Sequence, residues 1–373
     1  MGEGDRPQGG GGGAGSRSFE LQYAPTTMLR MVPLPRFAGE DGKSRYPVDE
    51  GHVSRAAPML RAIAFRVASL LLTLFIISVA IFVILEVLPG DPAAIMLGTS
   101  SQPDTLAALR HQMGLDQPAL VRYFAWIGGV FVGNFGISYS YGVPVAELIR
   151  DRLTVTVPLT LMAITLSLSV ALPLGVFAAA RQRGLVDAAA TVFSQLGIAI
   201  PNFWVGLLLI LFFALSLGWL PAGGFKGWSE GIWPSFKALI LPAIALAIPQ
   251  SAILTRVTRS AVLDVMNEDF VRTARAKGVS RNRALWHHVV PNALVPVVTI
   301  LGLQISVLLA GAVLVENVFS LPGMGRLAYQ ALAQRDLIVI KNVVLFFAAI
   351  VIVVNLIVDS IYIVLDPRLR ARA

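Results

Sequence analysis

Amide side chains inside long apolar runs are the residues of this sequence best suited to form hydrogen bonds in an apolar setting. The four candidates are Gln195, Asn202, Gln250 and Gln304, and prolines accompany them in the same runs. Polar groups and prolines are tolerated in apolar helices where the helices pack together or line a wet cavity. These amides could therefore face a translocation path, or they could bond neighbouring helices and have no other role.

Metal and thiol chemistry have little support in the sequence. The chain has no cysteine, and two of its four histidines, His287 and His288, are adjacent. Adjacent residues on a helix do not share a face, so this pair cannot converge on one metal ion. We therefore expect no catalytic residue, no metal site and no cofactor bound by this chain.

Ion coupling and ATP binding by this chain are also disfavoured. The apolar runs contain no Lys, Arg or His, and their only acids, Glu86 and Asp359, lie near run ends. A proton or sodium relay normally needs buried ionisable groups. Residues 42–44 resemble the end of a phosphate-binding loop, but Phe37 occupies the position of its first glycine. If the protein pumps a solute, another chain must bind the ATP.

The composition is that of a membrane protein. Hydrophobic residues make up 55% of the 373 residues and charged residues 14%, whereas soluble domains carry about a quarter charged residues. The net charge of +8 could suggest nucleic acid, but the basic residues lie between apolar runs. Six runs reach or approach the length of about 20 residues that crosses a bilayer: 67–88, 153–180, 188–220, 238–255, 289–315 and 342–365. The sequence thus predicts an all-α integral membrane protein with six transmembrane helices.

Basic clusters set the expected orientation of these helices. They lie at residues 55–66, 181–183, 256–283 and 368–372. With six spans all of these clusters face the cytoplasm, as the positive-inside rule requires, and both termini are cytoplasmic. The stretch 119–133 is shorter than a span and contains Arg122, so we expect it to be interfacial or re-entrant.

The chain is expected to fall into five parts. Residues 1–60 form a Gly-rich, disordered cytoplasmic tail, 61–88 the first transmembrane helix, and 89–152 an external segment with a helix at 104–113. Residues 153–365 form a five-helix core with a cytoplasmic loop at 256–288, and 366–373 form a cytoplasmic C-terminal tail. A mis-assigned start codon or an expression remnant is the alternative explanation of the first part.

The cytoplasmic loop has the pattern of two helices separated by a break. Good helix formers fill 264–277, Gly278 ends them, Ser280 can cap the next helix, and Pro291 falls in the first turn of the fifth span. Small residues such as Ala274 permit close approach of a partner, and the surrounding arginines can pair with acids. Attraction to anionic lipid would satisfy the same charges.

Residues 272–278 and 288–291 resemble the coupling-loop signature of inner-membrane permease subunits of ABC importers, in the dipeptide, oligopeptide and nickel group. That signature is Glu-Ala-Ala, any three residues, Gly, any nine residues, then Ile, any residue, Leu and Pro. Ala274, Gly278 and Pro291 match it in register, whereas other residues replace Glu, the first Ala, Ile and Leu. Residues 88–92, 316–325 and 366–370 are similar to stretches typical of the peptide branch, so the resemblance covers about residues 60–370.

The resemblance implies a permease subunit of the bacterial inner membrane. It would pair with a second, homologous permease and dock two cytoplasmic ATPase subunits, which bind ATP and magnesium. It would receive its substrate from a periplasmic or lipid-anchored binding protein, and it would bind no nucleic acid. The implied substrate is a di- or oligopeptide, although nickel, glutathione and opine-like compounds are carried by close relatives.

The resemblance also implies roles for particular residues. The ATPase-coupling loop would comprise Arg272, Thr273, Ala274, Arg275, Lys277, Gly278 and Pro291, and an external gate would comprise Glu316, Phe319, Pro322 and Gly323. ATP binding would move the loop and rock the bundles between inward-facing and outward-facing states. A self-contained channel or secondary transporter and a membrane scaffold without transport are the alternatives from other classes. The lack of buried charge weighs against the first of these.

Overall fold

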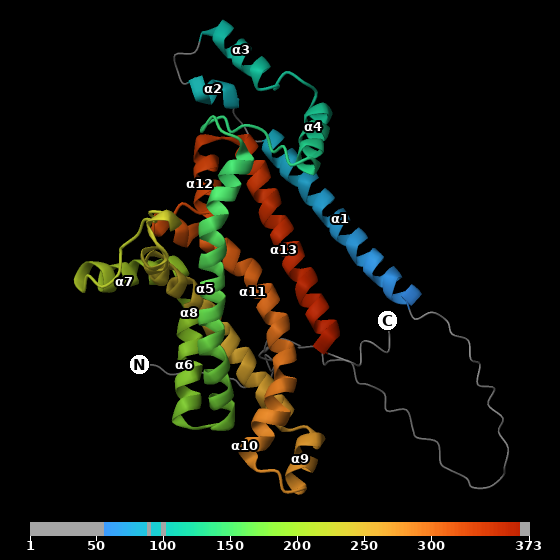
Figure 1. Cartoon of the computed structure of the whole chain (residues 1–373), viewed down its shortest axis with the longest axis vertical. Coiled ribbons are helices and arrows are strands. Elements are labelled where there is room, and N and C mark those ends of the chain that lie inside the picture. Colours follow the sequence, from blue (N-terminus) through green and yellow to red (C-terminus); the bar gives the residue numbers. More distant parts are fainter. Residues whose placement is uncertain (1–55, 88–90, 98–101, 366–373) are drawn as a thin grey trace, which may run out of the picture. The chain divides into compact units, whose positions relative to one another are not determined.

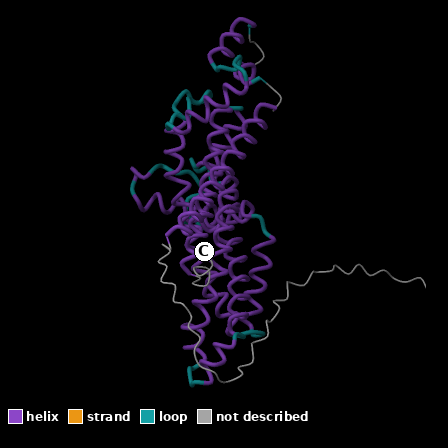
Figure 2. The backbone as a smooth tube through the Cα atoms, turned by 90° about the vertical axis from the view of Figure 1, so that its right-hand side faces the viewer, coloured by secondary structure: helices purple, strands orange, loops and turns teal. Residues whose placement is uncertain are grey.

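The computed structural model describes residues 56–87, 91–97 and 102–365, and most of them are helical (Figures 1 and 2). Within these residues the β structure is one isolated bridge, between Ile137 and Pro144. The predicted tail at 1–60 lies outside the described residues except for its last part, which belongs to the first helix. The predicted C-terminal tail at 366–373 also lies outside them.

The helices follow one another along the chain with short connections. Their bounds are α1 Ala56–Val87, α2 Pro92–Leu97, α3 Pro103–Gln112, α4 Ala119–Phe131, α5 Val145–Ala180, α6 Leu185–Ala199, α7 Asn202–Leu209, the π-helix η2 Ile210–Ser216, the 3₁₀-helix η3 Trp228–Glu230, α8 Ile232–Met266, α9 Asp269–Ala276, α10 Arg281–Ala284, the π-helix η4 Leu285–Val289, α11 Val290–Val318, α12 Met324–Gln334 and α13 Leu337–Leu365. The predicted helix at 104–113 corresponds to α3.

Five helices in the described part of the chain are long and apolar enough to cross a membrane: Val67–Val87, Val145–Ala180, Ile232–Met266, Arg281–Val318 and Leu337–Val358. They correspond to five of the predicted spans, and the last four of them begin before the predicted apolar runs do. The second begins at Val145 instead of residue 153, so the end of the predicted external segment 89–152 belongs to α5. The fourth and fifth predicted spans likewise continue past their apolar runs. The helices continue through charged residues at these ends, whereas the predicted spans stop at the first charge.

The third predicted span, 188–220, is not one straight helix in the structure. The segments Leu185–Ala199 and Asn202–Ser216 meet at an angle of 101°, and Figure 1 shows α7 turned sideways from α6. Ile200 adopts an extended conformation directly before Pro201, which is the conformation that a following proline favours. Pro201 also has no N–H to continue the helical hydrogen bonds. The pair counts as a sixth span only if the two segments together form one broken crossing.

Helix α8 is the centre of the bundle and α1 lies at its edge. In α8, 72% of the most apolar window is buried within the protein, against 11% in α1. Small residues let neighbouring helices approach α8 closely: a Cβ atom on Gly175 of α5 would lie 2.6 Å from Thr258 Cβ, and one on Gly197 of α6 would lie 2.6 Å from Ala252 Cβ. Such close contacts are the usual means of helix association in membranes.

The stretch predicted to be interfacial forms α4, which at 13 residues is shorter than a span. One face of α4 packs on α1, where Ser78 Oγ and Tyr123 Oη share a hydrogen bond of 2.8 Å. The indole Nε1 of Trp126 donates to Asn342 Oδ1 of α13 at 2.9 Å. These contacts join the predicted external segment to the first and last long helices.

Candidate functional site

The predicted coupling loop consists of two short helices at one end of the bundle, α9 and α10 (Figure 1). The single predicted helix at 264–277 is wrong, because α8 ends at Met266 and α9 begins at Asp269. Glu268, the residue before α9, has an extended backbone and separates the two helices. The break lets α9 turn away from the axis of α8.

One apolar residue fixes α9 against the bundle. Val271 is buried, and it belongs to a cluster with Val176 of α5, Val262 of α8 and Leu285 of η4. Ala274 is half-buried. The other coupling-loop candidates on and after α9, Arg272, Thr273, Arg275 and Lys277, are exposed. The loop is therefore anchored on three long helical segments and presents a basic surface outward.

Gly278 is required by the backbone of the turn between α9 and α10. Its φ is +89°, and a Cβ atom at this position would meet no atom within 4 Å. No other part of the described chain approaches Gly278 closely, so a contact that needs a glycine here could only be with another protein. The positive φ is what excludes most side chains, because L residues are strained in this region.

Pro291 lies in the first turn of α11, as predicted, but the helical path begins earlier. α10, η4 and α11 form one continuous run, Arg281–Val318. The π-helix η4, Leu285–Val289, directly precedes the proline. Its wider turn relieves the clash between a proline ring and the carbonyl one turn earlier. The coupling loop is thus continuous with a long helix.

At the other end of α11 the predicted gate residue Glu316 is completely buried and fully hydrogen-bonded. Its Oε1 accepts a hydrogen bond from Thr156 Oγ1 at 2.6 Å. Its Oε2 accepts hydrogen bonds from the backbone N–H groups of Gly325 at 2.8 Å and Arg326 at 3.1 Å. Thr156 Oγ1 in turn accepts from the N–H of Met324 at 2.8 Å. The carboxylate therefore caps the start of α12 and ties it to α5.

Of the other gate candidates, Gly323 lies directly against this carboxylate. A Cβ atom on Gly323 would overlap the Glu316 carboxylate, so no side chain fits at Gly323. Phe319 is completely buried, and its backbone carbonyl lies against Gly223 of the α7–α8 connection. Pro322, which lies between Phe319 and Gly323 in the sequence, is half-buried. We call the group of Glu316, Thr156, Phe319, Pro322 and Gly323 the Glu316 cluster.

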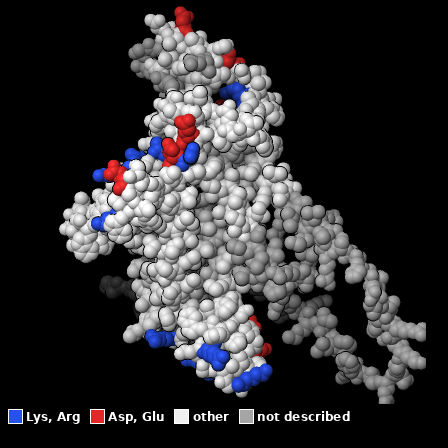
Figure 3. Space-filling model, in the orientation of Figure 1, with Lys and Arg blue, Asp and Glu red and all other residues white. Residues whose placement is uncertain are grey.

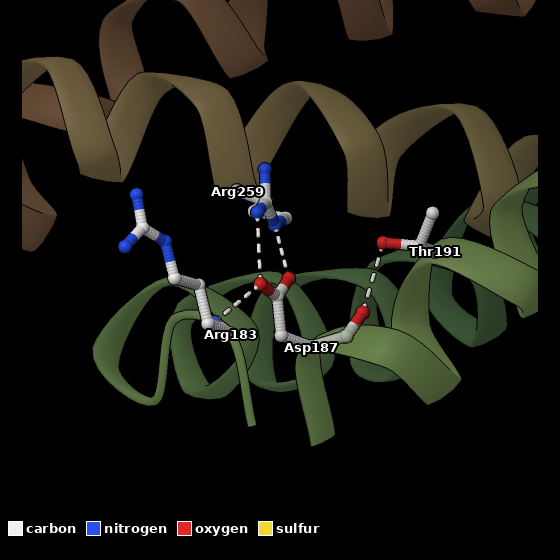
Figure 4. A network of polar contacts seen from close by, with 4 residues as sticks. All are labelled: Arg183, Asp187, Thr191 and Arg259. Atoms are coloured by element: carbon white, nitrogen blue, oxygen red, sulfur yellow. Dashed lines mark hydrogen bonds and ion pairs between the residues drawn. The ribbon is translucent and has the colours of Figure 1, made fainter. Parts of the chain in front are cut away.

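A second buried carboxylate, which no sequence motif marks, joins α6 to α8 (Figure 4). Asp187 is 6% exposed, and its Oδ2 accepts from Arg259 Nη2 at 2.9 Å and from the N–H of Arg183 at 2.9 Å. Arg259 Nε donates to the other oxygen, which makes the pair bidentate. Bidentate guanidinium–carboxylate contacts are strong and directional. They fix the start of α6 beside the C-terminal half of α8.

A third carboxylate anchors the predicted external segment. Asp336, between α12 and α13, accepts hydrogen bonds from Ser138 Oγ at 2.5 Å and from the N–H of Ser140 at 3.0 Å. Tyr139, the residue between them, donates its hydroxyl to Met113 O at 3.2 Å. Burial, together with the nearby charge of Asp336, raises the pKa of Tyr139 to about 12. The phenol therefore stays protonated and remains a donor at neutral pH.

The four amide candidates are not brought to one place. Gln250 and Gln304 are buried and border the same narrow gap between α8 and α11, and Gln250 Oε1 has no hydrogen-bond partner among the described residues. Asn202 is half-buried at the start of α7, with its side chain against Gly311 of α11. Gln195 is exposed and lines a separate pocket of about 220 Å³ with Thr255 and Arg259. Gln250 and Gln304 are thus the pair best placed to act together.

Comparison with protein families gives two adjoining matches. Residues 171–371 match the family described as binding-protein-dependent transport system inner membrane component. Residues 59–160 match the N-terminal part of such membrane components. Together the matches cover the long apolar helices described above, except for residues 161–170 in the middle of α5.

Several curated proteins are similar over most of their length. A probable peptide ABC transporter permease protein, y4tP, of Sinorhizobium fredii is 39% identical over 82% of this chain and 97% of its own. The oligopeptide transport system permease protein AppB of Bacillus subtilis is 42% identical over 79% and 94%. The glutathione transport system permease protein GsiC of Escherichia coli is 37% identical over 84% and 99%. A solved chain of the MetNI methionine ABC transporter is 17% identical, with a TM-score of 0.49 over 59% of this chain and 97% of that chain.

Proposed function

This chain belongs to the binding-protein-dependent transport system inner membrane components, and from that premise we propose that it forms half of the translocation path of an ATP-driven peptide importer. It is a multi-pass permease component of the bacterial inner membrane and not an enzyme. Relatives named as peptide and oligopeptide permeases support the substrate class. A glutathione permease among the relatives keeps that modified tripeptide as the second candidate, with nickel and opine-type compounds behind it.

The partners are a second, homologous permease, two ATPase subunits that bind ATP and magnesium, and a substrate-binding protein. The single observation that carries the coupling role is the position of α9. This helix is seated on the bundle through Val271 and exposes basic side chains beyond it. Because α9 packs on α5, α8 and η4, a displacement of α9 by a docked subunit would move these segments as well.

The membrane arrangement we propose has six crossings and both termini in the cytoplasm, with α6, α7 and η2 forming one broken crossing. The charge distribution supports it: Lys and Arg gather at the lower end of the face in Figure 3, where α9 and α10 lie in Figure 1. By the positive-inside rule this end is cytoplasmic. The external parts are then the segment from α2 to α4, the α7–α8 connection and α12.

The mechanism follows from the continuity of Arg281–Val318. ATP-driven closure of the ATPases would shift α9, and α10, η4 and α11 would carry the displacement toward the Glu316 cluster. Because Glu316 holds α12 and α5 together, the outer end would move as a rigid unit. Rocking of such units about a fixed path is a common form of alternating access. Gln250 and Gln304 would offer hydrogen bonds to peptide groups in that path.

Affinity purification of the tagged chain from mild detergent, followed by mass spectrometry, tests this function. We expect a second permease and one or two ATPase subunits to co-purify. Charge reversal of the loop by Arg272→Glu with Lys277→Glu should release the ATPases, whereas the matched control Lys226→Glu, on the exposed α7–α8 connection, should retain them. Recovery of this chain alone, active in uptake without ATP, would show that the proposal is wrong.

A further inference from the structure

A basic cleft lies between the end of α5 and the α9–α10 loop, and it shares Arg275 and Val271 with the coupling loop. Its charged lining is Arg181, Arg275 and Arg281, and no acidic residue lines it. Its apolar wall includes Phe177, Leu285 and Trp286, and its volume is about 360 Å³. We call it the arginine cleft.

The cleft is held open by contacts within the protein. Arg281 Nη2 donates to the backbone carbonyl of Ala180 at 2.9 Å, which ties α10 to the end of α5. The rings of Phe177 and Trp286 meet edge to face with centroids 6.3 Å apart. These contacts fix the end of α5 against α10 and η4, and Arg181 and Arg281 line the same space. A site of this kind needs little rearrangement to receive an anion.

The wall of the cleft continues onto apolar surface that faces outward. Phe177 is 45% exposed and Trp286 is 47% exposed. Phe177 is close to the end of a long apolar helix, and the exposed arginines begin directly after it. Tryptophan is enriched at the level of lipid headgroups. A free anion would use the arginines but would have no use for the exposed aromatic wall.

We propose that the arginine cleft binds the phosphate headgroup of an anionic phospholipid from the cytoplasmic leaflet, with its acyl chains along Phe177 and Trp286. Guanidinium groups recognise phosphate through paired hydrogen bonds. Basic pockets between helix ends on the cytoplasmic side suit such headgroups. The inference rests on the orientation given under the proposed function, which places this end of the bundle in the cytoplasm.

A bound headgroup would touch both the end of α5 and the coupling loop, because Arg275 belongs to α9 and Arg181 follows α5. It would neutralise charges that otherwise repel one another across the cleft. The lipid would then stiffen the contact through which α9 moves the bundle. Coupling would depend on the anionic lipid content of the membrane.

The test uses the assembled transporter in detergent, titrated with phosphatidylglycerol or phosphatidylcholine and followed by native mass spectrometry. We expect phosphatidylglycerol to be retained in preference to phosphatidylcholine. Arg181→Gln should weaken its retention about fivefold, which corresponds to the loss of one basic residue near a headgroup. Arg181→Lys, which keeps the charge, should retain most of the binding and shows that the position tolerates substitution. The matched control Arg283→Gln removes an exposed charge from α10 that does not line the cleft, and it should leave retention unchanged.

Three results would overturn the proposal. Equal loss in Arg181→Gln and Arg283→Gln would mean diffuse attraction without a site. Displacement of the lipid by millimolar inorganic phosphate would mean that the cleft takes the free anion. Higher lipid occupancy after the ATPases are stripped would mean that acidic residues of those subunits fill the cleft. Failure of the proposed function has a different signature, because the ATPases would then be absent from the purified assembly whatever lipid it retains.

Discussion

At the scale of single residues, Glu316 shows how a buried acid can serve architecture. Both of its oxygens accept hydrogen bonds, and all of the donors come from α5 and the start of α12. Charge-assisted bonds of this kind are strong where water is excluded. The residue therefore fixes the position of two elements at the end of α11 that is opposite the coupling loop.

Replacement of this carboxylate should cost stability. Glu316→Gln replaces one acceptor oxygen with an NH₂ donor, which would face N–H or O–H donors, so we expect a loss of about 1–3 kcal/mol. The change should lower the midpoint of thermal unfolding in detergent. Glu147→Gln, on the exposed first turn of α5, is the control and should unfold like the unsubstituted protein. Equal midpoints for both variants would show that the Glu316 cluster is not a stabilising contact.

At the scale of elements, the bundle depends on small residues where α5 and α6 cross α8. A Cβ atom at Gly175 would lie 2.9 Å from the backbone carbonyl of Thr255, in addition to its overlap with Thr258. Backbone cannot move aside as a flexible side chain can. The close crossing of α5 and α8 therefore requires a glycine at position 175.

Gly175→Ala tests this crossing. We expect a loss of about 1–3 kcal/mol from overpacking, seen as a lower midpoint of thermal unfolding. The matched control is Gly128→Ala in α4, where a Cβ atom would meet nothing within 4 Å. That control should be neutral or slightly stabilising, because alanine favours a helix over glycine. A stable Gly175→Ala variant would mean that α5 and α8 are not in close contact.

The turn after α9 makes a separate prediction. A β-branched residue at Gly278 would be strained at φ +89°, and the cost of about 1–2 kcal/mol for a left-handed residue shifts the local equilibrium about five- to thirtyfold. Gly278→Val should therefore reduce ATP-dependent uptake while insertion stays normal. Gly278→Asn, which tolerates left-handed conformations better, should keep more activity. Equal uptake by both variants would show that the turn conformation does not matter for coupling.

Apolar run length predicted which segments are long helices but not where they bend or end. Pro201 coincides with the 101° break, yet Pro158, Pro173, Pro242 and Pro249 lie inside helices that continue through them. A proline alone therefore does not locate a bend, because neighbouring helices decide whether the freed backbone is satisfied. Glu147 and Arg150 belong to the first turns of α5. A span defined as an uncharged run cannot include them, so the predicted helix starts too late.

Sequence motifs likewise locate some residues of the candidate sites but not the residues that they contact. The coupling loop and Glu316 lie in local motifs that can be recognised along the sequence. Their partners cannot, because Thr156 is 160 residues from Glu316, and Arg259 is 72 residues from Asp187. Pairing over such separations depends on how the helices pack, and periodicity within one segment carries no information about it.

At the scale of the whole molecule, six crossings place the α7–α8 connection and α9 on opposite sides of the membrane. The chain has no cysteine, so a single introduced cysteine is a unique label site. Ser229→Cys, which is exposed near η3, should react with a membrane-impermeant maleimide in intact, right-side-out vesicles. Thr273→Cys should react only in inverted vesicles. Labelling of both positions from one side would contradict the six-crossing arrangement.

The central claim, that α9 is the surface on which an ATPase docks, is tested most directly by site-specific cross-linking in the assembled transporter. Thr273 is exposed on α9, and Thr273→Cys can carry a cysteine-reactive benzophenone. We predict that illumination joins this chain to an ATPase subunit, and that the same probe at Ser229→Cys does not. A transporter that contains its ATPases and imports substrate, yet forms no such adduct at Thr273, would contradict the account.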